Sequence, residues 1–180
     1  MYAIEMHEPS EEFARCWSAA GRHLSVSAQD GFLSWLKKDL IPPFLEHLSF
    51  RMGNQLFFVR IDDVDGNVRG PGNLGGFRAI AKGCSGVPCR MPMRRTGSGW
   101  KPELSGWGLI HDDTGQPLNP VVLISEEQIK MTDWEVQDFS VQVVRDYIVG
   151  KLGRELMSSQ GNPEVDPSIW FVGEDGTEWV

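Results

Sequence analysis

The stretch NQLFFVRIDDVDGNVRGPGNLGGFRAIAKGCSGVPCRMPM, residues 54–93, changes its residue pattern three times. Residues 54–68 are rich in aromatic and β-branched side chains, and this composition predicts a strand. Residues 69–76 hold four glycines and a proline, which predicts a loop because regular structure is costly for such a segment. Residues 76–84 then predict a short helix and residues 87–93 a second strand. The stretch therefore indicates a fold in which strands and helices alternate.

The segment before this stretch predicts two helices. Residues 10–24 begin with Ser10, a residue type that caps helix N-termini, and acidic residues follow it. The apolar residues of this segment fall on one stripe at helical spacing: Phe13, Cys16, Trp17, Ala20 and Leu24. Residues 30–41 predict a second helix, which the proline pair at 42–43 ends or bends.

The clearest helix signal lies near the C-terminal end, in residues 132–152. Thr132 and Glu135 form a capping-box pattern, and Gly153 is placed to end the helix. The predicted buried stripe is Val136, Phe139, Val143, Val144, Tyr147, Ile148 and Leu152. Short strands are expected at 107–113, 120–125, 155–159, 167–172 and 177–180, whereas residues 94–106 are expected to be irregular.

These elements predict a single domain of α/β or α+β class over residues 1–180. We expect a mixed or antiparallel sheet of about five to seven strands, with two N-terminal helices and one long C-terminal helix. The formal net charge of −8 is divided unevenly, +2 over residues 1–105 and −10 over residues 106–180, so these segments are possible lobes. Such asymmetry favours attraction between the two halves, and its alternative is a basic face for an acidic partner.

Composition excludes several classes of protein. No window approaches the roughly 18 apolar residues of a membrane span, and the first residues lack the features of a signal peptide. We therefore expect a cytoplasmic location and no membrane partner. Cys16, Cys84 and Cys89 form no CxxC pair, which favours buried thiols over a disulfide framework or a zinc site. No cofactor is expected.

Residues 132–180 bear a partial resemblance to the PD-(D/E)XK pattern of restriction-endonuclease-like folds. The resemblance implies a metal-dependent nuclease in which carboxylates hold Mg²⁺, with Asp166 and Glu178 as metal ligands, or a degenerate relative of such a nuclease. The helix acid would be Glu135 or Asp138. The sequence departs from the pattern at Val180, where a lysine is expected. The alternative is a hairpin with an acidic turn, and this is the interpretation that we favour.

The segment 90–107 combines basic and aromatic residues: Arg90, Arg94, Arg95, Trp100, Lys101 and Trp107. Tryptophan and arginine anchor many protein interfaces, and the same combination binds single-stranded nucleic acid by charge and stacking. A third interpretation is that the tryptophans pack inward and the arginines are solvated. In general texture the sequence resembles bacterial proteins. We predict a non-enzymatic binding or accessory protein whose partner is another protein or a second copy of this chain. Nucleic acid is the less favoured partner. This function predicts that Trp100 or Trp107 is exposed.

Overall fold

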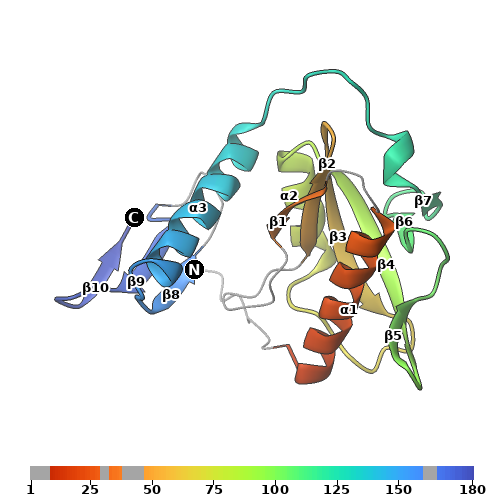
Figure 1. The fold of residues 1–180 in the computed structure, drawn as a ribbon, viewed down its shortest axis with the longest axis horizontal. Coiled ribbons are helices and arrows are strands. Elements are labelled where there is room, and N and C mark those ends of the chain that lie inside the picture. Colours follow the sequence, from red (N-terminus) through yellow and green to blue (C-terminus); the bar gives the residue numbers. More distant parts are fainter. Residues whose placement is uncertain (1–8, 29–32, 38–46, 160–165) are drawn as a thin grey trace. The chain divides into compact units, whose positions relative to one another are not determined.

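The computed structural model describes residues 9–28, 33–37, 47–159 and 166–180, apart from the side chains of 33–37 and of residue 138. The chain forms two compact units, Met1–Ile129 and Lys130–Val180, each with its own sheet (Figure 1). Helices and mixed strands in one chain confirm the predicted α/β or α+β class. In the described parts of the chain, no helix is long and apolar enough to cross a membrane.

The first helix, α1, runs from Glu11 to Ser27 and confirms the N-terminal prediction. The Ser10 hydroxyl accepts a hydrogen bond from the Phe13 amide at 3.2 Å, which satisfies one of the amides at the helix start. All five residues of the predicted stripe are buried: Phe13, Cys16, Trp17, Ala20 and Leu24. The apolar spacing therefore identifies the face that α1 turns to the core.

The sheet of the first unit has the order β1-β2-β3-β4-β6-β7, and β5 pairs with β4. Among the described strands of this sheet only β3 and β4 pair in parallel, and helix α2, Leu74–Gly83, makes the connection that such a pair needs. The strands are β1 (Leu33–Lys37), β2 (Leu48–Met52), β3 (Gln55–Asp63), β4 (Val87–Thr96), β5 (Gly99–Pro102), β6 (Leu109–His111) and β7 (Pro117–Leu118).

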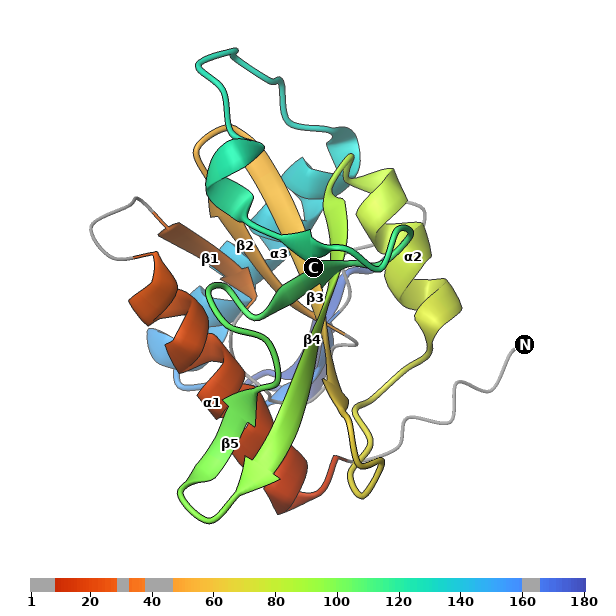
Figure 2. The ribbon, with the colours of Figure 1, turned by 90° about the vertical axis from the view of Figure 1, so that its right-hand side faces the viewer.

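Both faces of this sheet are covered, with α1 on one side and α2 on the other (Figure 2). Along β3, Phe57 and Val59 belong to the core cluster that contains the α1 stripe. Phe58 points to the opposite face, where its ring lies 4.9 Å from that of His47, which in turn lies 6.3 Å from Phe77 of α2. Burial on both faces explains why β3 reads as a continuous apolar run rather than an alternating one.

Three predictions about the first unit are wrong. The second N-terminal helix does not form within residues 33–37, which pair with β2 as strand β1; the rest of 30–41 lies outside the described residues. The prediction of irregular structure is wrong for most of residues 94–106, since residues 94–96 complete β4 and Gly99–Pro102 form β5, whereas residues 103–106 lie in bends and a turn. Within 120–125, Pro120–Val122 is a 3₁₀ helix rather than a strand. Short apolar runs are ambiguous in sequence, and here long-range strand pairing decides the outcome.

The second unit consists of helix α3, Asp133–Gly150, and a three-stranded antiparallel sheet of order β10-β9-β8. The Thr132 hydroxyl accepts a hydrogen bond from the Glu135 amide at 3.2 Å, as the capping pattern predicts. The three predicted C-terminal strands are confirmed as β8 (Leu156–Ser159), β9 (Ile169–Val172) and β10 (Thr177–Trp179).

The apolar face of α3 that packs on this sheet shares only Val144 and Ile148 with the predicted stripe. Val141 and Ile148 are buried with Ile169 and Phe171 of β9, and Val144 packs against them. Five members of the predicted stripe are exposed: Val136, Phe139, Val143, Tyr147 and Leu152. The helix carries two apolar faces, and a sheet of three short strands covers only one of them.

Candidate binding groove

The basic and aromatic segment forms the β4–β5 hairpin. In β4 the alternate residues Cys89, Met91 and Met93 are buried in the core that contains the α1 stripe, so Arg90 and Arg94 lie on the other face of the strand. Arg95 continues the α1 side and reaches Glu12. Opposite residues in the hairpin are Arg95 with Trp100 and Arg94 with Lys101. The hairpin therefore places Trp100 toward α1 and leaves Lys101 exposed.

The three arginines of the segment are paired with carboxylates of the chain. Arg90 Nε lies 2.6 Å from Asp62, and Arg95 Nε lies 2.8 Å from Glu12. Arg94 contacts Glu103 at 2.6 Å and Asp65 at 2.9 Å. Their hydrogen-bonding groups are thus partly engaged within the protein, and an external partner would have to compete for them.

The Arg94–Glu103 pair also shifts both ionisation equilibria. The hydrogen bond from Arg94 lowers the pKa of the Glu103 carboxyl below its ordinary value. The same hydrogen bond, with the charges of Asp65 and Glu103, raises the pKa of the Arg94 guanidinium. Both groups are therefore charged at neutral pH.

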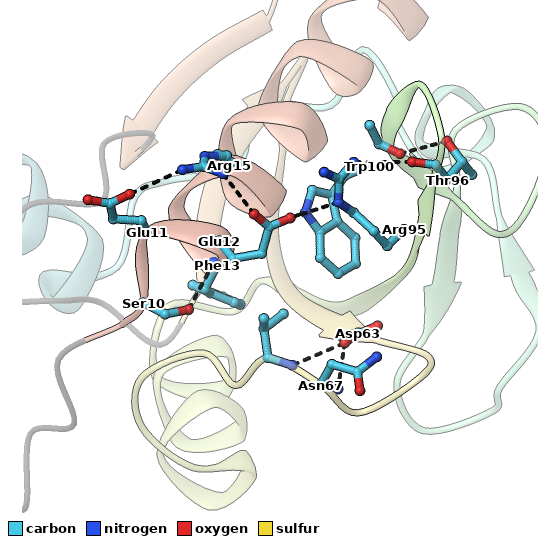
Figure 3. Close-up of polar contacts among 12 residues, drawn as sticks. Ser10, Glu11, Glu12, Phe13, Arg15, Asp63, Asn67, Arg95, Thr96 and Trp100 are labelled. Atoms are coloured by element: carbon cyan, nitrogen blue, oxygen red, sulfur yellow. Dashed lines mark hydrogen bonds and ion pairs between the residues drawn. The ribbon is translucent and has the colours of Figure 1, made fainter.

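Both tryptophans of the segment are buried, each 9% exposed, so the expectation of an exposed tryptophan here is wrong. Trp107 stacks on Phe50 with ring centroids 6.4 Å apart. Trp100 packs in the same core and donates from Nε1 to Glu12 at 2.7 Å (Figure 3). A large aromatic ring whose N–H has a partner is stable in a core, which explains the inward packing.

A groove lies between α1 and β5, and it includes two of the residues that the sequence singles out. It has a volume of about 470 Å³, within the size range of ligand pockets. Its lining residues are Ala19, Arg22, His23 and Val26 on α1, and Trp100, Lys101, Pro102 and Leu104 on the hairpin and the loop after it. We call this the α1–β5 groove.

The lining of the α1–β5 groove combines cationic and apolar residues. Arg22 and Lys101 are exposed, and neither has an ion-pair partner among the residues that the structure describes. No acidic residue lines the groove, whereas Trp100, Ala19 and Pro102 supply apolar surface. Such a surface can hold an apolar group and pair with a negative charge beside it.

A histidine fixes one wall of the groove. His23 Nε2 lies 2.8 Å from the carbonyl oxygen of Gly106, and because a carbonyl only accepts, the imidazole donates. The Ser27 hydroxyl lies 3.3 Å from the same nitrogen. These contacts join α1 to the loop after β5, so both walls are held by polar bonds as well as by the core.

Among the described residues, the carboxylates of the predicted nuclease site do not form a metal-binding group. Glu135 is 4% exposed on α3, whereas Glu178 on β10 accepts a hydrogen bond from the Glu174 amide at 3.2 Å. Glu178 lies opposite Phe171, five residues along the chain from Asp166. Over the described ranges, no three His, Cys, Asp or Glu residues form a metal-binding group. The Asp138 side chain lies outside those ranges, so the nuclease alternative stays a prediction.

The glycine-rich segment 69–76 borders a second pocket of about 440 Å³ at the end of β3. The Asp63 carboxylate accepts hydrogen bonds from the amides of Asp65, Asn67 and Val68, which holds the turn before this segment. Figure 3 shows the contact between Asp63 and Asn67. Gly70 is required by packing, since a Cβ there would lie 2.6 Å from the Phe13 ring. The composition of the segment is thus explained by the fold, in part.

The α1 side of the groove was missed by sequence reasoning. Ala19, Arg22, His23 and Val26 lie three, four and seven residues apart, the spacing of one helix face. This face lies beside the buried stripe, and nothing in the sequence indicates that β5 packs next to it.

No protein-family model, curated protein or solved structure matches the chain.

Proposed function

We propose that this protein is a non-enzymatic binding protein that holds a partner protein in the α1–β5 groove. The observation that carries the proposal is the pair of cations at the groove, Arg22 and Lys101, which no described carboxylate of the chain neutralises. The neighbouring arginines 90, 94 and 95 all have such carboxylates. An apolar centre with a polar rim is the usual composition of a protein interface.

The support beneath the groove also favours binding without large rearrangement. Glu12 accepts from Trp100 and pairs with Arg95 and Arg15, so one carboxylate links α1 to both strands of the hairpin (Figure 3). His23 attaches the following loop. A surface whose walls are already fixed loses less conformational entropy when a partner binds.

Affinity capture from a lysate of the source organism tests the proposal with a charge-reversed variant. The bait is the full chain, either unchanged or carrying both Arg22→Glu and Lys101→Glu. We expect a partner that the unchanged bait retains and that the variant loses. The matched control carries Lys82→Glu and Lys151→Glu, because both lysines are exposed and neither lines the groove.

The control separates a groove effect from a general effect of charge. Both variants change the net charge by the same amount, so loss of a partner by both would indicate non-specific electrostatic capture. An identical set of captured proteins for all three baits would refute the proposal. Circular dichroism of each bait confirms that the substitutions leave the fold intact.

A further inference from the structure

We infer that the α1–β5 groove recognises a peptide segment in which a carboxylate side chain lies next to a large apolar side chain. The inference rests on the proposed function and adds the chemistry of the partner. Arg22 and Lys101 supply the positive charge, one from each wall of the groove. Trp100, Pro102, Leu104 and Val26 supply apolar surface in the same groove.

Charge complementarity decides the sign of the partner. No acidic residue lines the groove, and Arg22 and Lys101 have no ion-pair partner among the described residues. A guanidinium presents a planar fork of donors that matches a carboxylate, and an ammonium adds a second point charge. A segment with one or two carboxylates would satisfy these donors and displace only surface water.

The apolar lining indicates that the partner carries a large apolar side chain as well as a negative charge. Val26 is 75% exposed, a high value for a valine that borders a pocket. Ala19, two turns earlier on the same helix face, is small, and the space between the walls amounts to about 470 Å³. A leucine, phenylalanine or tryptophan side chain placed there would bury Val26 and part of Pro102, which gains free energy through the apolar area removed from water.

Single-stranded nucleic acid fits the groove less well than a peptide does. Stacking of bases requires an exposed aromatic face, yet Trp100 is only 9% exposed and its Nε1 is bonded to Glu12. Two cations also neutralise too few phosphates to give appreciable affinity at physiological salt.

Selection from a phage-displayed library of random seven-residue peptides tests the inference. The immobilised full chain is the target, and the variant with Arg22→Glu and Lys101→Glu serves for counter-selection. We expect the enriched peptides to combine aspartate or glutamate with leucine, phenylalanine or tryptophan. The best peptide is then synthesised together with a version in which asparagine and glutamine replace its acids.

Fluorescence anisotropy compares the two synthetic peptides. We expect the neutral version to bind about tenfold more weakly, the size of two partly exposed ion pairs. The difference is expected to shrink to about twofold in 1 M NaCl, where charges are screened within roughly 3 Å. The variant with Lys82→Glu and Lys151→Glu is expected to bind both peptides as the unchanged protein does.

The outcomes separate the inference from the proposed function. Groove-dependent peptides without acidic residues, or equal affinity of the two synthetic peptides, would overturn the inference and leave the proposed function standing. Failure to enrich any peptide that distinguishes the protein from its groove variant would overturn both. Groove-dependent binding of a fluorescein-labelled 20-nucleotide thymidine strand, with no peptide enriched, would replace the peptide by nucleic acid.

Discussion

The indole nitrogen of Trp100 donates a 2.7 Å hydrogen bond to Glu12, and this contact joins β5 to the first turn of α1 across 88 positions of sequence. The same carboxylate contacts Arg95 at 2.8 Å and Arg15 at 3.0 Å. Glu12 therefore holds together the two elements that form the α1–β5 groove, and its side chain is only 32% exposed.

Replacement of Glu12 by alanine is expected to destabilise the protein by about 1 kcal/mol. The substitution leaves the buried Trp100 N–H without an acceptor and removes the partner of Arg95, and partial exposure limits the cost. Urea unfolding followed by tryptophan fluorescence measures the change. The control is Glu11→Ala, whose side chain is 92% exposed and contacts only Arg15 among the described residues. Equal midpoints for the two variants would contradict the role assigned to Glu12.

Replacement of Gly70 by alanine is expected to cost about 1–3 kcal/mol of stability. The added methyl group would lie 2.6 Å from the ring of Phe13, which is 1% exposed and belongs to the core of the first unit. Gly97→Ala is the matched control, since a Cβ there meets nothing within 4 Å. Thermal unfolding of both variants by circular dichroism provides the comparison, and an unchanged midpoint for Gly70→Ala would show that the loop yields without penalty.

The Arg94–Glu103 pair predicts a dependence of stability on acid pH. The pKa of Glu103 is lower in the folded protein than its ordinary value of 4.5. Its contribution is therefore complete above that value and is lost as the pH falls through the lowered pKa of the folded state. We expect the stability difference between the unchanged protein and Glu103→Gln to shrink at acid pH. Urea unfolding at neutral and acid pH measures it.

An NMR titration of the Glu103 carboxyl tests the cause of this shift directly. Arg94→Gln removes the donor, so the pKa of Glu103 is expected to move back toward 4.5. Lys101→Gln is the control, because it removes a positive charge from the strand position opposite Arg94. A Glu103 pKa that is unaffected by Arg94→Gln would show that the hydrogen bond is not its cause.

The hairpin interpretation of residues 166–180 predicts no thermal stabilisation by millimolar Mg²⁺ or Mn²⁺. Glu178 bonds to the Glu174 amide, and the described carboxylates form no three-residue group, so little free energy is available for a divalent ion. Scanning fluorimetry with and without metal is the measurement. Stabilisation that disappears in Asp166→Ala would revive the nuclease alternative.

Local signals in the sequence predicted several elements well. The cap at Ser10, the buried stripe of α1 and the cap at Thr132 each depend on residues that are close together in the sequence. The strand β3 followed from its aromatic and β-branched composition, and the strand predicted at residues 87–93 forms most of β4. Each of these features is decided within a few turns or residues of the chain, which is the range that pattern reasoning covers.

Two of the errors involve contacts between distant residues. Leu33–Lys37 forms a strand because it pairs with the edge of β2, and the residue pattern of this segment gives no sign of that pairing. In α3 the sequence offers two apolar faces, and only the packing of Ile169 and Phe171 chooses the one with Val141 and Ile148. Tertiary pairing overrides local preference in both cases.

The groove was half predicted for the same reason. Trp100 and Lys101 were identified by their residue types within one segment, although the burial of Trp100 was not. Arg22 and His23 come from α1, about 80 residues earlier, and only the packing of α1 beside β5 places them there. Periodicity predicted the buried stripe of α1, but it did not show which exposed face borders a pocket.

Site-specific photo-crosslinking tests the central claim, that the α1–β5 groove holds a partner protein, most directly. Benzoylphenylalanine is introduced at Val26, which lines the groove and is 75% exposed, or at Lys82, an exposed control position on α2. The account predicts a discrete crosslinked protein in cells illuminated with the Val26 variant and none with the Lys82 variant. We expect this crosslinked product to be lost when Arg22→Glu and Lys101→Glu are added, which would show that its formation depends on the two cations of the groove. The same products from both positions, or none from Val26, would contradict the account.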